Sequence, residues 1–86
     1  MLYMVIEHFK DRKSGAVYER FREKGRMMPD GLNYVDSWVE PNFGRCFQLM
    51  ECEDPSLFAL WTANWQDLMD FEIVSVITSK EARDQA

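Results

Sequence analysis

The sequence is poor in the residue types on which the common catalytic and binding motifs depend. Its 86 residues include one histidine, two cysteines and four glycines. It contains no glycine-rich phosphate loop, no nucleophile elbow, no zinc-protease helix and no EF-hand loop. These absences exclude the motif-defined enzyme classes, and the residues alone name no reaction.

Clusters of basic residues are also missing. Ten Lys and Arg stand against fifteen Asp and Glu, which leaves a net charge of −5. Binding to nucleic acid or to an anionic membrane surface is therefore disfavoured. The apolar segment Met1 to Phe9 is too short for a membrane span and has no basic flank typical of a signal peptide. We expect a cytoplasmic protein with neither a nucleic-acid nor a membrane partner.

The two cysteines do not form a recognisable pair. Cys46 and Cys52 lie in one predicted strand, where a separation of six residues corresponds to roughly 20 Å. That distance is too long for a disulfide. There is no CxxC motif and no Cys/His cluster, so we expect no metal site and no cofactor.

Aromatic residues, by contrast, are abundant. Apolar residues make up 47% of the chain and aromatic residues 14%, with three Trp and six Phe. This composition is that of one globular domain, which we place at residues 1–79, with a polar tail at 80–86. More aromatic residues than a minimal core needs indicate a buried interface or a pocket.

The hydrophobic periodicity predicts four strands and two helices. One helix starts near Ser14 as its cap and stops at Gly25, and the second starts at Asp54-Pro55 and continues to Leu68. The polar end, Ser79 to Ala86, reads as frayed or weakly helical. The predicted strands are Leu2–Phe9, Leu32–Glu40, Arg45–Glu53 and Phe71–Thr78.

The order β-α-β-β-α-β predicts a ferredoxin-like α+β fold. Right-handed crossovers convert this order into a four-stranded antiparallel sheet with both helices on one face. The other face should then be polar at alternate positions of each strand. In the first and last strands, however, the residues that point to either face are apolar. Because a second copy of the chain is the simplest cover for that face, we expect a homodimer.

The short connection Pro41–Gly44 predicts a hairpin and assigns side chains to the two faces. It pairs Trp38 with Phe47 and Tyr34 with Glu51, and these bulky residues should meet the partner. The opposite face should pack under the helices, and a register error of one residue would exchange the two sets. That face carries Val35, Ser37, Val39, Cys46, Gln48, Met50 and Cys52.

Four groups of residues are candidates for a functional site. One group consists of the strand carboxylates Glu7, Asp36, Glu51 and Glu72, for which ordinary rim charges are the simpler interpretation. His8 has the side chain best suited to proton transfer near neutral pH, although a solvated histidine at a strand end is the simpler interpretation. Trp61 and Trp65 share one helical stripe, and with Ser37 and Gln48 they are our candidates for ligand binding, although such a stripe is more often plain core. Arg22 and Arg26 could bind an acidic ligand or complement the helix dipole.

Three segments carry a resemblance to known proteins: MLYMVIEHFK, YERFREKGRMMPDGLNYVDSWVE and GRCFQLMECEDPSLFALWTANWQDLMDFEIVSVITS. Together they resemble a small bacterial family catalogued as a domain of unknown function, number 3303. The resemblance extends from Met1 to about Ser79 and implies the dimeric α/β-barrel superfamily of ferredoxin-like proteins. Pockets in that superfamily usually lie between the sheet and the helices, and its members include cofactor-free monooxygenases, haem-degrading enzymes, isomerases and stress-responsive proteins. A haem-related reading would need His8, Asn64 and Trp65 to converge.

These observations leave different classes of function open. The first is a homodimer that binds a small apolar or aromatic molecule in a pocket between helices and sheet. The second is a non-enzymatic interaction or regulatory module, for which we expect a solid core without a cavity of ligand size. A monooxygenase-like or haem-related enzyme remains as an analogy of fold. Whether the protein is an enzyme stays open at this point.

Overall fold

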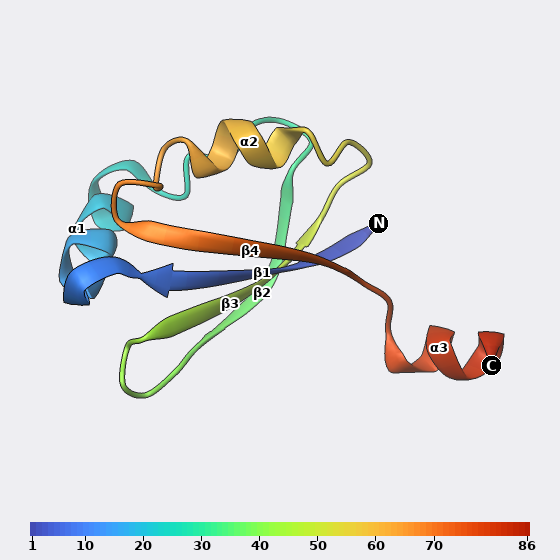
Figure 1. Ribbon diagram of the computed structural model, residues 1–86. Coiled ribbons are helices and arrows are strands. Elements are labelled where there is room, and N and C mark those ends of the chain that lie inside the picture. The colour runs from blue at the N-terminus through green and yellow to red at the C-terminus, as the bar shows by residue number, and fades with distance from the viewer.

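A computed structural model describes all 86 residues and has the expected α+β architecture, with a four-stranded antiparallel sheet in the order β2-β3-β1-β4. This is the strand order of a ferredoxin-like fold, and the prediction of fold class is confirmed. Figure 1 shows α1 and α2 on one side of the sheet. The elements are β1 (Leu2–Phe9), a 3-10 turn (Lys10–Arg12), α1 (Ser14–Lys24), β2 (Asn33–Val39), β3 (Arg45–Glu51), α2 (Leu57–Thr62), β4 (Met69–Val76) and α3 (Ser79–Gln85).

Strand β1 lies at the centre of the sheet and shows how the two faces differ. It pairs antiparallel with β3 on one side and with β4 on the other. Because successive side chains of a strand point to opposite faces, Tyr3, Val5 and Glu7 share the helix-covered face, and all three are buried. His8, one residue beyond Glu7, points to the opposite face and is exposed.

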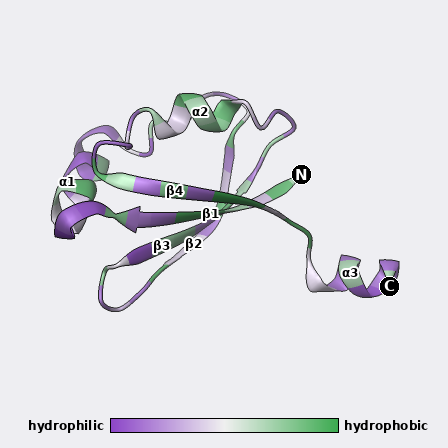
Figure 2. Ribbon diagram, in the orientation of Figure 1, coloured by the Kyte–Doolittle hydropathy of each residue, from purple (hydrophilic) through white to green (hydrophobic).

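The hydrophobic core fills the space between the sheet and the two helices. Val5, Met50 and Trp61 are among its most deeply buried members. Figure 2 shows apolar residues along β1 and on α2, while α3 is largely polar. The core cluster consists of Tyr3, Val5, Val17, Leu32, Met50, Cys52, Phe58, Trp61, Trp65, Leu68 and Met69.

Helix α1 ends where the sequence predicted, but its start differs. Gly25 follows the last helical residue with a φ of 67°, and its N–H donates to the carbonyl of Phe21. Ser14 is the first helical residue rather than the cap, and Lys13 occupies the cap position without a capping side chain. The stop at Gly25 is therefore confirmed and the cap at Ser14 was wrong.

Helix α2 is shorter than the aromatic stripe suggested. Asp54 does not cap it; its Oδ1 accepts hydrogen bonds from the N–H and hydroxyl of Ser56, and α2 begins at Leu57. After Thr62 the chain continues as turns, in which the N–H of Trp65 donates to the carbonyl of Thr62. These turns keep Trp65 on the buried side. The aromatic residues therefore share one buried side as predicted, although the regular helix ends at Thr62.

The hairpin register is correct at its closed end and wrong at its open end. Trp38 pairs with Phe47 as predicted, but a bulge between Tyr34 and Asp36 shifts the remainder by one residue. Tyr34 therefore pairs with Met50 instead of Glu51, and it lies on the helix-covered face rather than facing a partner. An extra residue in one strand reverses the alternation beyond it.

The face of the sheet opposite the helices is open and largely apolar. We call it the open face. Trp38 is 52% exposed, and Val74 is 39% exposed. Figure 1 shows that α3, predicted as a weakly helical tail, extends away from the sheet and the other helices. None of the helices combines the length and the hydropathy that crossing a membrane requires. The remaining open-face apolar residues are Leu2, Met4, Ile6, Phe47, Leu49 and Val76.

The end of α1 makes a direct test of backbone conformation possible. No atom lies within 4 Å of a Cβ added at Gly25 or at Gly15, so neither substitution to alanine causes a steric clash. Gly25→Ala should lower the free energy of unfolding by about 1 to 2 kcal/mol, because its positive φ strains an alanine. Gly15→Ala in α1 should raise it by about 0.5 kcal/mol. Equal effects in chemical denaturation would contradict the glycine stop.

Candidate functional site

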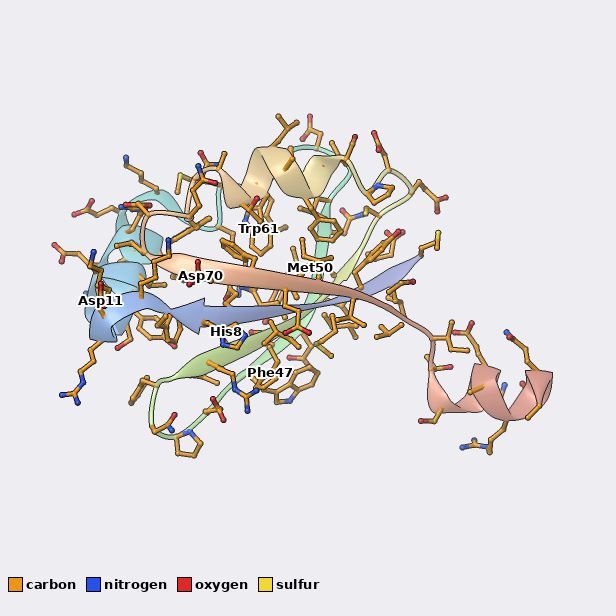
Figure 3. The ribbon with its side chains drawn as sticks, viewed as in Figure 1. His8, Asp11, Phe47, Met50, Trp61 and Asp70 are labelled. Atoms are coloured by element: carbon orange, nitrogen blue, oxygen red, sulfur yellow. The ribbon has the colours of Figure 1, made fainter.

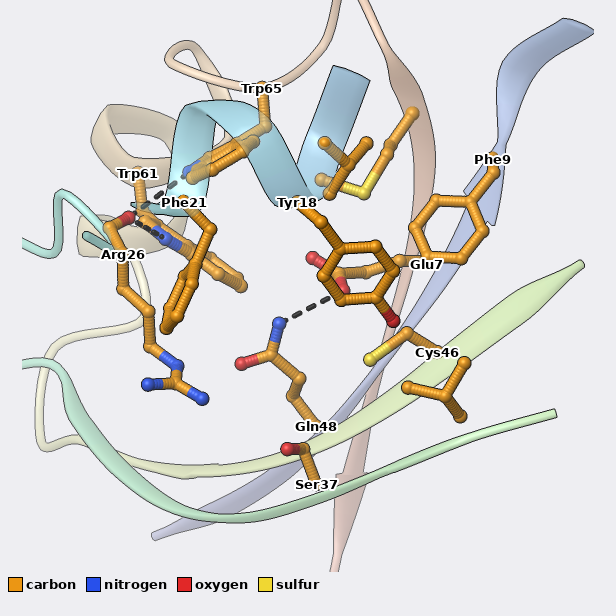
Figure 4. A pocket seen from close by; sticks show the side chains of 13 residues that line it. Glu7, Phe9, Tyr18, Phe21, Arg26, Ser37, Cys46, Gln48, Trp61 and Trp65 are labelled. Atoms are coloured by element: carbon orange, nitrogen blue, oxygen red, sulfur yellow. Dashed lines mark hydrogen bonds between the residues drawn. The ribbon is translucent and has the colours of Figure 1, made fainter. Parts of the chain in front are cut away.

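A cavity of about 160 Å³ lies between the sheet and the helices. Nine of its thirteen lining residues are apolar, so it suits an apolar body with few polar contacts. Figure 4 shows the lining side chains, with Arg26 and Phe9 on opposite sides and Glu7 and Gln48 between them. The lining residues are Glu7, Phe9, Val17, Tyr18, Phe21, Arg26, Ser37, Val39, Cys46, Gln48, Trp61, Trp65 and Met69.

The four residues predicted from the sequence as ligand contacts all line this cavity. Ser37 and Gln48 are direct partners across β2 and β3, which places both side chains on the helix-covered face. Trp61 comes from α2, and Trp65 comes from the turns that follow it. The structure thus brings together residues from two distant segments.

The two tryptophans also fix the segment that follows α1. The indole Nε1 of Trp61 and that of Trp65 both donate to the carbonyl of Arg26, at 2.9 and 3.0 Å. The Nδ2 of Asn64 donates to the carbonyl of Met27 at 3.2 Å. Both dashed bonds to Arg26 are visible in Figure 4. Arg26 is consequently held in place by its backbone, which leaves its side chain free to face the cavity.

Glu7 and Gln48 form a buried polar pair in the wall of the cavity. Gln48 Nε2 donates to Glu7 Oε1 at 2.9 Å, and Glu7 is only 3% exposed. Burial raises the pKa of Glu7, although the hydrogen bond from Gln48 opposes that effect. The side-chain oxygen of Gln48, Oε1, is buried without a hydrogen-bond partner. The pair therefore offers an unused acceptor to any molecule in the cavity.

Cys46 and Tyr18 are the other titratable groups near this pair. Burial raises the pKa of the Cys46 thiol to about 12, and the charge of Glu7, its direct partner across the strands, adds to that effect. Burial likewise raises the pKa of Tyr18. A thiol with so high a pKa is a poor nucleophile at neutral pH. Cys46 thus contributes shape and apolar surface rather than reactivity.

His8, the predicted catalytic candidate, lies outside this site. Its side chain points to the open face, where Nε2 is 3.9 Å from Glu72 Oε1. Figure 3 shows His8 and Phe47 on the side of the sheet opposite Trp61. His8, Asn64 and Trp65 therefore do not converge, which removes the basis of the haem-related reading. No three His, Cys, Asp or Glu side chains lie close enough to hold a metal ion.

Glu7 and Arg26 are the two charged residues of the site, and the sequence reasoning placed neither of them beside Trp61 and Trp65. The parity of β1 could have identified Glu7, because it shares its face with the apolar Tyr3 and Val5. Arg26 was considered together with Arg22 as a possible contact for an acidic ligand, with the helix dipole as the alternative. No spacing in the sequence indicates that two indoles bind its carbonyl, since that contact joins residues 35 and 39 positions apart.

Comparison with known proteins agrees with the resemblance seen in the sequence. The chain matches the family described as a domain of unknown function, DUF3303, over residues 1–86, and it belongs to that family. No curated protein and no solved structure matches it. The family description specifies neither an activity nor a ligand, so the site must be interpreted from its own geometry.

The buried carboxyl of Glu7 should make stability depend on pH. Between about pH 4.3, the ordinary glutamate pKa, and its raised pKa, the native protein keeps a proton that the unfolded chain has lost. The free energy of unfolding should therefore fall as pH rises, by about 1.4 kcal/mol per pH unit within that window. Glu7→Gln retains an acceptor for Gln48 and should remove this contribution.

Thermal unfolding of both proteins across about pH 4.5 to pH 8 measures the difference. The stability of Glu7→Gln relative to the wild type should increase with pH. The exposed Glu19 of α1 provides the control, and Glu19→Gln should follow the wild type. A constant difference between Glu7→Gln and the wild type would show that the carboxyl is charged throughout.

Proposed function

We propose that the protein is a homodimer that binds a small apolar or aromatic molecule in the cavity between its helices and its sheet. The observation that supports this most directly is the unpartnered Gln48 Oε1 in a cavity with mainly apolar walls. Buried polar atoms nearly always have a partner, and each exception calls for an explanation. A bound molecule with a hydrogen-bond donor supplies one.

The volume of the cavity limits the ligand to about one ring. An engineered protein cavity of about 150 Å³ is known to take benzene, and this cavity has about 160 Å³. Drug-sized ligands need about 300 Å³ or more. Rings also suit the walls, because Phe21, Trp61 and Trp65 present aromatic surface to the cavity.

The dimer is supported by the open face. Its centre is apolar, while the charged residues Asp36, Glu40, Arg45 and Glu72 lie around it, as in interfaces with an apolar core and a polar rim. Arg45 already forms an ion pair with Glu40 at 2.8 Å. Because this part of the rim carries charges of both signs, two identical copies should not repel one another strongly. The separate position of α3 is a second reason, because a partner would give it a surface to contact.

The same face favours a second candidate function, a non-enzymatic interaction or regulatory module. In that reading the cavity has no ligand and the open face binds the partner on which the function depends. The two functions differ in what occupies the cavity. They can therefore be separated by measurements on the cavity that leave the open face intact.

Binding can be tested with benzene, phenol and indole as one-ring and two-ring probes. Trp61 and Trp65 line the cavity, so their fluorescence should change when a ring enters. Ser37→Phe places a ring in the cavity itself and should weaken phenol binding by at least about tenfold. Ser75→Phe makes the same change on β4, away from the cavity lining, and should bind phenol like the wild type.

Native mass spectrometry of the purified protein complements this titration. Additional mass on the wild type and its absence from Ser37→Phe would identify a ligand carried from the cell. A wild type that carries no additional mass and binds none of the three probes would contradict the ligand-binding proposal and leave the interaction module.

The dimer can be tested by placing a charge on the open face. Trp38→Glu should raise the dimer dissociation constant by at least about a hundredfold, because a buried, unpaired carboxylate is strongly unfavourable in an interface. Leu60, on α2, is 62% exposed but lies on the helix side, and Leu60→Glu should leave the dimer intact. Analytical ultracentrifugation across a range of concentrations measures both constants. A monomeric wild type would rule out the homodimer.

A further inference from the structure

We infer that the cavity binds a small aromatic acid, with the carboxylate of the ligand on Arg26 and a hydroxyl or amine donor on Gln48 Oε1. This inference rests on the proposed ligand-binding function and specifies the class of ligand. It depends on three features of the cavity. The guanidinium of Arg26 faces the cavity, Gln48 Oε1 is a buried acceptor without a donor, and the carboxyl of Glu7 disfavours a second anion at its own end of the cavity.

Arg26 presents its guanidinium to the cavity in a fixed orientation. Its carbonyl is held by the indoles of Trp61 and Trp65, and its guanidinium carbon lies 3.7 Å from the centre of the Tyr34 ring. The ring of Phe21 is 5.0 Å away. Stacking uses the flat faces of a guanidinium and leaves its N–H groups, which lie in the plane, available as a fork. Such a fork matches the two oxygens of a carboxylate.

No acidic side chain of the protein meets this fork. Arg20 and Arg45 each pair with a carboxylate, Asp67 and Glu40 respectively, at 2.7 and 2.8 Å. Arg26 forms no ion pair, and its guanidinium donates to no acceptor, although the chain has an excess of acidic residues. A half-buried cation beside apolar walls is stabilised when an anion reaches it. The charge of Arg26 lowers the pKa of Glu7, but the two side chains form no hydrogen bond or ion pair, so an anion in direct contact with the guanidinium would come from outside the chain.

Gln48 determines the second polar group of the ligand. Its amide nitrogen is committed to Glu7, which orients its Oε1 as an acceptor. That oxygen is buried and has no donor in the protein. A hydroxyl or amine on the ring of the ligand would supply the missing hydrogen, whereas a second carboxylate could not. The ligand is therefore expected to have one acidic group and one donor.

Glu7 determines which way round the ligand lies. A ligand carboxylate beside Glu7 would bring two carboxyl groups together in an apolar environment, which is unfavourable while both are ionised. At the Arg26 side of the cavity the same carboxylate meets a positive charge. The acidic group therefore belongs at Arg26 and the donor at the Glu7–Gln48 pair, which matches the arrangement in Figure 4.

Three matched probes separate these contributions in isothermal titration at neutral pH. para-Hydroxybenzoate carries both groups, para-hydroxybenzamide replaces the acid by a neutral amide of nearly the same shape, and para-methoxybenzoate keeps the acid but blocks the donor. For the wild type we expect the hydroxybenzoate to bind about tenfold or more tightly than either of the others, because charge-assisted and buried hydrogen bonds are each worth that much.

Variants at Arg26 test the origin of the preference for an acid. Arg26→Gln should abolish the preference of hydroxybenzoate over hydroxybenzamide, while binding of the amide stays within about threefold. Arg26→Lys keeps the charge but loses the planar fork, so part of the preference should remain. Arg22→Gln changes an exposed arginine of α1 outside the cavity lining and should keep the full preference. Circular dichroism confirms that each variant is folded.

The outcomes distinguish this inference from the proposed function beneath it. Equal affinities of the wild type for the acid and the amide would overturn the inference and leave the proposal of a ligand cavity standing. Equal affinities for the hydroxy and methoxy acids would overturn the assignment of Gln48 as acceptor. No binding of any of these probes, or of phenol and benzene, would overturn both. An acid preference that survives in Arg26→Gln would place the anion elsewhere and contradict the inference.

Discussion

One contact determines the shape of the helix side of this molecule: the carbonyl of Arg26 accepts hydrogen bonds from two indole N–H groups, those of Trp61 and Trp65. The contact joins the end of α1 to α2 and to the turns behind it, and so holds the two helices as one layer over the sheet. A carbonyl with two lone pairs can satisfy both donors, which would otherwise be unpaired in the core. The same contact positions the side chain of Arg26 at the cavity.

The cavity is an unusual feature in so short a chain. A domain of this size buries a limited fraction of its surface, so its margin of stability is small. Here part of the interior is left empty, and a carboxyl with a raised pKa is buried in its wall. Both features lower stability relative to a filled apolar core. Such features concentrate at functional sites, and the proposed function depends on the cavity rather than on any conspicuous motif.

The two proposed interactions use opposite faces of the sheet. Side chains of β1 alternate between them, so Glu7 belongs to the cavity and its neighbour His8 belongs to the open face. The cavity is lined by side chains from the sheet and from the helix side, whereas the open face has no cover of its own. The proposed ligand and the proposed partner can therefore be tested independently, although a single strand can contribute to both faces: in β2, Ser37 lines the cavity and Trp38 lies on the open face.

The order of the elements, the hairpin at Pro41–Gly44 and the face on which Ser37 and Gln48 lie can all be predicted from the amino-acid pattern, because they follow from local periodicity and turn chemistry. The pattern also places Trp61 and Trp65 on the buried side of their segment. The remaining features of the site arise from tertiary contacts. The bulge before Asp36 turned Tyr34 to the other face, and contacts between distant segments made Glu7 a buried acid and Arg26 a positioned cation. Burial and long-range hydrogen bonds depend on which segments meet, and no local pattern in the chain encodes that meeting.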